Sequence, residues 1–168
     1  MLYLVLAVLI VSAGCSPQPR ADLVFLNGAE PETLDPALIT GQPEGRVTNA
    51  LFEGLLTFDQ SGKPQPGMAE SWTVSEDGRI YTFTLREGLT WSDGTPLTAR
   101  DFVESWRRTL DPATASEYAY QLNYIKNARA FNEGKSEDFS QVGVSAPDER
   151  TLRVELENPT PFFADLCA

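Results

Sequence analysis

Carboxylates are the side chains of this sequence that most readily suggest chemistry on a ligand. Asp93 and Asp101 lie close together along the chain, and two carboxylates form the catalytic pair of most glycoside hydrolases. However, Asp93 stands in the turn sequence Ser92-Asp93-Gly94, and Asp101 follows Thr98 by three residues, which is the spacing of a helix capping box. Local turn and capping chemistry accounts for both carboxylates, so we expect neither to be catalytic.

Aromatic side chains are the second group that could contact a ligand. Trp72, Trp91 and Trp106 could form a platform for stacking on sugars, but tryptophans are large apolar residues, and we interpret all three as core residues. Tyr118 and Tyr120 lie in a predicted helix. A tyrosine has an apolar ring and a polar hydroxyl group, so these two are candidate ligand contacts as well as half-buried helix residues.

Several classes of function are disfavoured by what the sequence lacks. It contains no histidine, which is the commonest general base and metal ligand, and it contains no glycine-rich phosphate loop, cysteine-rich metal spacing or nucleophile elbow. We therefore predict no enzymatic activity, no metal and no cofactor. The net charge of −11 repels nucleic acids and anionic lipids, although such acidity also simply keeps proteins in solution.

The N-terminus has the features of an export signal. Residues 1–14 carry no charge and are too short for the roughly 20-residue helix that spans a bilayer, as is typical of a signal peptide. Small residues at 12–14 lead into Cys15, a pattern that resembles a bacterial lipobox. We predict that Cys15 is lipidated and that residues 15–20 form a linker; an ordinary thiol is the alternative. Cys167 has apolar neighbours, so we expect it to be buried and to form no disulfide.

The elements that would position these residues can be predicted from periodicity and turn signals. Residues 23–26 form a short apolar run that predicts a buried strand, and the prolines in 30–36 predict an ordered turn. Apolar residues at helical spacing predict a helix in 43–56. Four further elements are predicted: a hairpin through Asp77-Gly78 into the alternating segment 81–86, a helix from Thr98 to Leu110, a helix over 116–132, and a hairpin of 142–146 with 151–156.

The order and spacing of several short motifs resemble a known family, the oligopeptide-binding proteins of ABC importers, which are family-five extracellular solute-binding proteins. The motifs that carry this resemblance are Thr33-Leu34-Asp35-Pro36, Phe52-Glu53-Gly54-Leu55-Leu56, Pro66-Gly67-Met68-Ala69-Glu70-Ser71-Trp72, Tyr81-Thr82-Phe83-Thr84-Leu85-Arg86, Trp91-Ser92-Asp93-Gly94-Thr95-Pro96, Asp101-Phe102-Val103, and Pro159-Thr160-Pro161-Phe162-Phe163.

The resemblance implies an α/β fold of the periplasmic-binding-protein-like kind, class II with an extra domain, present here in incomplete form. Residues 21–52 would be the start of the first ligand-binding lobe, and residues 53–168 most of the additional small domain. The second lobe of the family would be absent from this chain. Some apolar surface of residues 21–52 would then lack the strands that normally cover it.

The resemblance also implies a function and candidate ligand contacts. The chain would capture peptides outside the cytoplasm, in the periplasm or lipid-anchored on the outer face of the cell membrane, as a monomer that delivers them to the permease subunits of an ABC transporter. Thr40, Gly41 and Gln42 would run alongside the peptide and could hold it by main-chain hydrogen bonds, and Tyr118 would reach the same pocket. The alternatives are a receptor for dipeptides, nickel or another small solute, a secreted hydrolase, and a remnant that binds nothing.

Overall fold

The structure of the protein is a computed structural model, and it describes residues 24–168. Its helices and strands are, in chain order, α2 (Gln42–Leu51), β1 (Leu56–Phe58), β2 (Pro64–Pro66), β3 (Ala69–Val74), β4 (Ile80–Leu85), α3 (Ala99–Leu110), α4 (Ala128–Asn132), β5 (Val144–Ser145) and β6 (Thr151–Glu155). Short 3-10 helices complete the chain: η1 (Pro112–Thr114), η2 (Ala119–Leu122), η3 (Phe139–Gln141) and η4 (Asp165–Cys167).

A four-stranded antiparallel sheet is the centre of the molecule. Its strand order is β3-β4-β6-β5, while β1 and β2 form a separate hairpin. In β4 the residues Tyr81, Phe83 and Leu85 are buried and alternate with less buried neighbours, which confirms the strand predicted from the alternating pattern of 81–86. Both predicted hairpins are present, as β3 with β4 and as β5 with β6.

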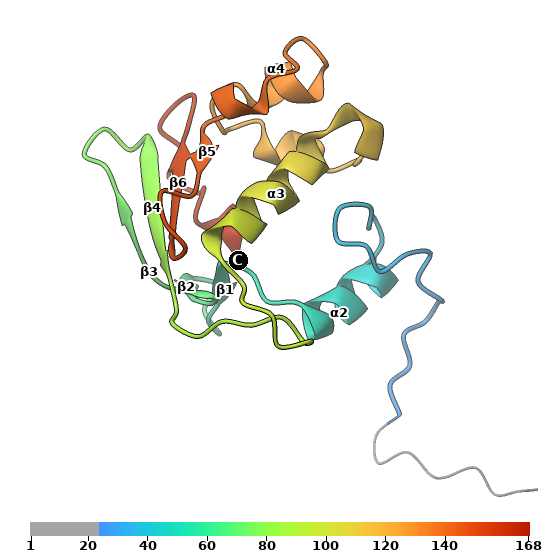
Figure 1. The fold of residues 1–168 in the computed structure, drawn as a ribbon. Helices are drawn as coiled ribbons and strands as arrows, with labels where there is room; N and C mark the ends of the chain where they lie inside the picture. The colour runs from blue at the N-terminus through green and yellow to red at the C-terminus, as the bar shows by residue number, and fades with distance from the viewer. Residues whose placement is uncertain (1–23) are drawn as a thin grey trace, which may run out of the picture.

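One face of this sheet is covered by α3, as Figure 1 shows. Phe83 on the sheet and Leu110 on α3 are fully buried, and the Trp106 ring of α3 meets the Phe163 ring edge-on at a centroid distance of 6.4 Å. Burying each large apolar side chain in this way stabilises the fold by about 1.5–3 kcal/mol. None of the helices within residues 24–168 combines the length and the apolar character that crossing a membrane requires.

Helix α3 begins and ends where the sequence predicts. The Asp101 carboxylate accepts hydrogen bonds from the backbone N–H of Thr98 at 2.7 Å and from its hydroxyl at 2.9 Å, which caps the first turn. The helix ends at Leu110 because Asp111 is extended and Pro112 cannot continue the hydrogen-bonding pattern. Asp93 likewise accepts from the N–H and hydroxyl groups of Thr95, which confirms its role in a turn.

The helix predicted over 116–132 is wrong. Only the short helices η2 and α4 form there, separated by an irregular stretch. In that stretch Ile125 is fully buried and pairs with Leu156 as an antiparallel bridge, and Asn127 has a left-handed backbone with φ of 59°. Pairing with the end of β6 therefore overrides the local helical pattern.

The N-terminal part of the described chain also departs from expectation. Residues 24–26 form no strand, and their apolar side chains are exposed to solvent. Helix α2 ends at Leu51, earlier than predicted, because the backbone of Phe52 is extended. A strand needs a neighbouring strand to satisfy its backbone groups, and within residues 24–168 none lies beside 24–26.

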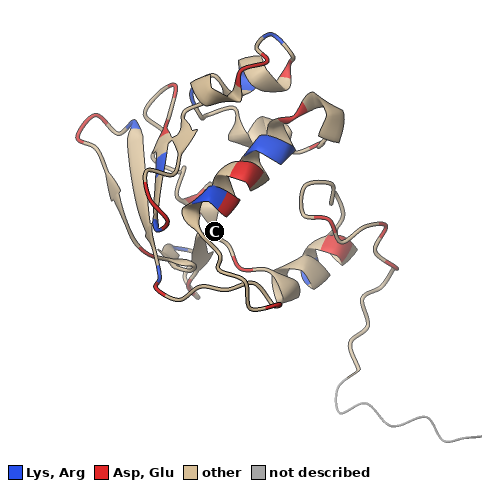
Figure 2. Ribbon diagram, in the orientation of Figure 1, with Lys and Arg blue, Asp and Glu red and all other residues tan. Residues whose placement is uncertain are grey.

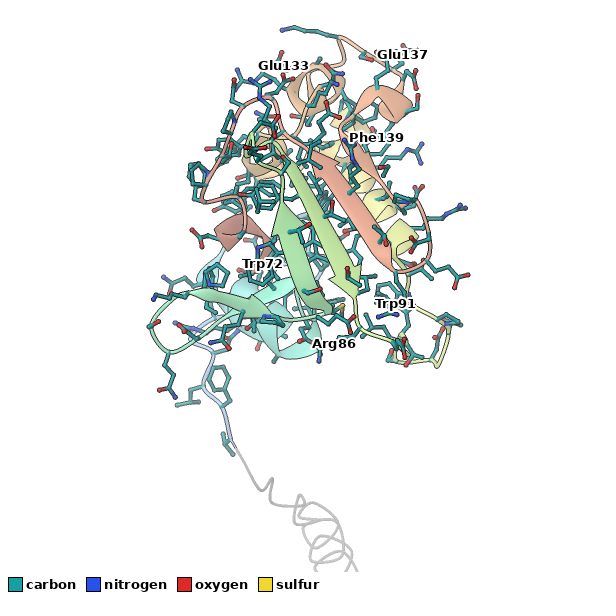
Figure 3. The ribbon with its side chains drawn as sticks, turned by 90° about the vertical axis from the view of Figure 1, so that its left-hand side faces the viewer. Trp72, Arg86, Trp91, Glu133, Glu137 and Phe139 are labelled. Carbon is teal, nitrogen blue, oxygen red and sulfur yellow. The ribbon has the colours of Figure 1, made fainter. Side chains whose placement is uncertain are left out.

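The three tryptophans do not share one environment. Trp72 and Trp106 pack against the core, as predicted. Trp91 is 43% exposed, and Figure 3 shows it beyond the end of the sheet, in the loop that follows β4. The expectation of a core position was wrong for Trp91 because its neighbours form a tight turn, Trp91 N–H and Gly94 N–H both donating within that turn.

The entry to β1 lies against the C-terminal helix η4. A Cβ atom added to Gly54 would lie 2.9 Å from the carbonyl oxygen of Leu56 and 3.0 Å from that of Cys167, so a larger residue there would force the backbone to shift. The backbone of Gly54 also accepts a hydrogen bond from Met68 N–H at 3.0 Å. Residues 54 and 167 thus meet where the chain enters β1.

Candidate ligand-binding site

The chain just before α2 forms an ordered turn at residues 35–39, as the prolines in 30–36 predict. The carbonyl oxygen of Asp35 accepts hydrogen bonds from Leu38 N–H at 2.9 Å and Ile39 N–H at 3.2 Å. The carboxylate of Asp35 accepts a further bond from Ala37 N–H at 3.1 Å. This turn sets the direction in which the chain reaches Thr40.

The structure brings Tyr118 and Thr40 together, two of the residues predicted to contact a ligand. The Tyr118 hydroxyl donates a hydrogen bond of 3.2 Å to the backbone carbonyl oxygen of Thr40, across 78 positions of sequence. Tyr118 is the N-cap residue of η2 and is 42% exposed, and Thr40 and Gly41 are exposed as well. The hydrogen bond therefore joins two surfaces that both remain open to solvent.

Gly41 and Gln42 lie beside this contact but differ in their backbone. Gly41 is extended, with φ −103° and ψ 163°, whereas Gln42 is already the first residue of α2. The carbonyl of Gly41 accepts from Gly45 N–H at 3.1 Å in the first helical turn, and the Gln42 side chain accepts from Arg46. The extended backbone of Gly41 is therefore suited to main-chain pairing with a peptide, whereas Gln42 is already helical.

Glu44 organises this segment, and sequence reasoning missed it. Its side chain is buried, and its Oε1 accepts a hydrogen bond from Glu32 N–H at 2.9 Å. That backbone N–H lowers the pKa of Glu44, with further backbone N–H groups adding to the effect. A Cβ atom on Gly41 would collide with the Glu44 carboxylate, so Gly41 must be glycine for Glu44 to lie there. The only available signal was an acidic residue in the first turn of a predicted helix.

Thr40 and Gly41 line a hollow of about 290 Å³ in this segment. Its remaining walls come from the turn and the start of α2: Ala29, Glu30, Glu32, Thr33, Leu38, Pro43 and Glu44. A larger hollow of about 490 Å³ lies between Asp35 to Ala37, Phe52 and helix α3. Apolar rings and side chains of Phe52, Trp91 and Phe102 line it together with Asp35 and Arg108.

An ion pair spans the edge of the larger hollow. Arg108 of α3 donates two hydrogen bonds to the carboxylate of Asp35, at 2.7 Å to Oδ1 and 2.5 Å to Oδ2. The bidentate contact with Arg108 is the main reason that the pKa of Asp35 is lowered. Figure 2 shows that the acidic positions of α3 lie between basic positions near its two ends, and Arg108 is one of these basic positions.

Tyr120 extends the aromatic surface beside Tyr118. The two rings are tilted at 57° with centroids 6.0 Å apart, and Tyr120 is 57% exposed. The sequence indicates both tyrosines as candidate ligand contacts. The structure places them next to each other because η2 is a short 3-10 turn, not the long helix that was predicted.

The two cysteines lie near opposite ends of the chain. Cys15, the predicted lipidation site, lies outside the described residues. Cys167 is buried, as expected, and desolvation raises the pKa of its thiol to about 12. Within residues 24–168 there is no group of three or more acidic or thiol side chains that could hold a metal ion.

Known proteins resemble this chain over most of its length. A model of the bacterial extracellular solute-binding proteins, family 5 middle, matches residues 63–168. The periplasmic oligopeptide-binding protein OppA of Escherichia coli is 47% identical over 158 residues, which cover 93% of this chain and 29% of OppA. The chain thus spans less than a third of the length of the curated relatives it matches.

Two solved structures have the same fold over the shared region. The Escherichia coli murein tripeptide binding protein MppA matches with a TM-score of 0.79 and 47% identity, covering 83% of this chain and 27% of MppA. Haemophilus influenzae OppA, in complex with RPPGFSPFR, matches with a TM-score of 0.80 and 45% identity, covering 84% of this chain and 28% of that protein. At these identities the likeness extends from fold to sequence.

Proposed function

We propose, from the premise that the chain belongs to the family 5 bacterial extracellular solute-binding proteins, that it forms part of a receptor that captures peptides outside the cytoplasm. Its fold is the periplasmic-binding-protein-like α/β fold of OppA and MppA, of which it comprises a part. We assign residues 21–52 to the start of a ligand-binding lobe and residues 53–168 to an additional small domain.

The observation that carries the proposal is the hydrogen bond between Tyr118 and Thr40. It joins the two stretches assigned to different parts of the receptor at the edge of a hollow. Within residues 24–168, Thr40 N–H makes no hydrogen bond. An extended peptide could pair with this backbone through main-chain groups, which every peptide has, while its side chains vary.

The wider role follows from the family. In this proposal the receptor acts by reversible binding, without covalent chemistry, and passes its peptide to the permease subunits of an ABC importer. It is exported, held at the outer face of the membrane by a lipid on Cys15, and monomeric. Its relative OppA is named as a periplasmic protein, which supports a location outside the cytoplasm.

The experiment is a titration of the isotope-labelled chain with L-trialanine, followed by NMR. We expect saturable shifts of the Thr40 and Gly41 amide signals and of the Tyr118 ring signals, while β4 and β6 stay unchanged. The control is D-trialanine, which has the same composition and charge and cannot place its side chains in the same register. Equal shifts with both forms, or no shift at these residues, would count against a peptide contact at Thr40, Gly41 and Tyr118.

The same titration separates the alternatives. A receptor for dipeptides responds to glycylglycine and not to trialanine, and a nickel receptor responds to Ni²⁺. A secreted hydrolase would show new signals of free alanine over time. Trialanine recovered intact, together with saturable shifts, supports reversible capture.

A further inference from the structure

Very few contacts hold the N-terminal segment, residues 24–52, against the body, residues 53–168. Between these two parts of the described chain, the only hydrogen bonds are those of Arg108 with Asp35 and of Tyr118 with Thr40. Within the described residues, no side chain of the segment belongs to the buried core, and Phe25 and Leu26 are more than half exposed. The placement of the segment therefore depends on the polar contacts of Arg108 and Tyr118.

Arg108 lies on a part of α3 that is held in place by packing against the core. It stands between Trp106, which packs against the core, and Leu110, which is fully buried. Helix α3 is capped at its start by Asp101, so both ends of the helix are fixed. Its neighbour Arg107 pairs with Glu104 of the same helix at 3.2 Å and does not reach the segment. Arg108 is thus the residue through which α3 holds the turn.

Asp35 connects Arg108 to the backbone of the turn at residues 35–39. The same carboxylate oxygen that accepts from Arg108 also accepts from Ala37 N–H, and the Asp35 carbonyl closes the turn through Leu38 and Ile39. A shift of the carboxylate would therefore move the turn. Thr40 directly follows this turn, so its carbonyl meets the Tyr118 hydroxyl only when the turn is in place.

We propose that Arg108 is a positioning residue of the peptide site: by its two-pronged bond to Asp35 it sets the turn that presents Thr40 and Gly41 to a ligand next to Tyr118. This inference rests on the proposed function. Because the contact needs a planar fork with two donors in fixed geometry, lysine cannot replace arginine there. The ion pair is partly exposed, so it contributes to placement much more than to global stability.

Hydrogen exchange of the intact chain tests the positioning role. In Arg108→Lys and Arg108→Gln we expect the amides of Ala37, Leu38 and Ile39 to exchange about threefold to tenfold faster. Amides of β4 and β6 should keep their rates. The matched control is Arg107→Gln, which removes an equal charge from the adjacent position. Unchanged exchange in the turn, or an equal rise in the sheet, would overturn the proposal.

A double-variant cycle identifies Asp35 as the mediator. Asp35→Asn removes the charge but keeps an oxygen for Ala37, and we expect it to raise exchange in the turn as Arg108→Gln does. Combining the two should add nothing beyond either one, since they remove a single shared contact. Effects that add up would show that Arg108 does not act through Asp35.

Titration with L-trialanine separates this inference from the proposed function. We expect the apparent Kd to rise about threefold to tenfold in Arg108→Lys, with no change in Arg107→Gln. If the unaltered chain binds no trialanine while the exchange results hold, the peptide function fails and the structural role of Arg108 remains. If it binds with the same Kd in Arg108→Lys, positioning of the site by Arg108 is wrong.

Discussion

The body and the N-terminal segment contain similar apolar residues, and the two regions use them in opposite ways. Phe83 and Leu152 of the body are fully buried, while Phe25 and Leu26 of the segment are 64% and 87% exposed. The body folds around its own sheet and helix, whereas the segment is held by an ion pair and a hydrogen bond. Stability and the geometry of the proposed site therefore reside in different parts of the chain.

The strongest test of this comparison replaces one phenylalanine in each region. Phe83→Ala removes the central side chain of β4 and should lower the free energy of unfolding by about 3–5 kcal/mol, because it leaves a cavity in the core. Phe25→Ala should change it by less than about 0.5 kcal/mol. Urea titration followed by circular dichroism measures both. Equal losses would mean that the segment is part of the same core.

Alanine substitutions at two glycines, one in each region, test the same contrast between the body and the segment. A Cβ atom at Gly143 would collide with the carbonyl oxygen of Glu155 and lie 2.9 Å from Lys126, so Gly143→Ala should cost about 1–3 kcal/mol. Gly45 in α2 has open space around it, and Gly45→Ala should stabilise that helix by about 0.5–1 kcal/mol.

The measurement for this pair is global unfolding together with hydrogen exchange of α2. We expect Gly143→Ala to shift the unfolding midpoint, and Gly45→Ala to slow exchange in α2 with little change of the midpoint. A large rise of the midpoint in Gly45→Ala would show that α2 unfolds together with the sheet.

Alkaline pH should weaken the body through Cys167. Burial raises the pKa of this thiol from 9.0 to about 12, so the unfolded chain ionises first. Stability is thus full below pH 9 and falls as pH rises towards 12, with a slope of at most about 1.4 kcal/mol per pH unit. Comparing unfolding at pH 8, 9 and 10 in the natural chain and in Cys167→Ala isolates this contribution. The same slope in both would exclude it.

The smallest expected effect concerns the segment alone. Tyr118→Phe removes the hydroxyl that reaches Thr40 and should cost at most about 1 kcal/mol, seen as faster exchange of the turn amides. Tyr124→Phe is the matched control, because Tyr124 is similarly exposed and its hydroxyl makes no hydrogen bond within residues 24–168. Global unfolding should be unaltered in both. Equal exchange in the two variants would show that the contact does not hold the segment.

Local sequence patterns correctly predicted the elements that depend on interactions between residues close together in the chain. The alternation of 81–86 predicted β4, and the Thr98 to Asp101 spacing predicted the start of α3, because strand pairing and capping obey short-range geometry. The pattern at 116–132 failed because a distant partner, Leu156, pairs with Ile125. No local signal in the sequence contains that pairing.

The residues of the candidate site likewise include some that the sequence indicates and others that only the fold reveals. Thr40 and Tyr118 were selected by family resemblance, and their direct contact is an outcome of the tertiary fold. Glu44 and Arg108 were not selected, because a charged residue on a helix usually indicates only a solvated face. Their partners, Glu32 and Asp35, become visible as partners only once the turn is folded.

The meeting of Gly54 and Cys167 brings two points that are far apart in the sequence within reach of one covalent bridge. Because residues 54 and 167 touch, the chain returns at residue 167 to the point where it enters β1. A short covalent bridge would join residues 54 and 167, and a cut beside the exposed Asp77 would lie in the turn between β3 and β4. Residues 54–167 can in this sense be circularised with the strand order of the sheet unchanged.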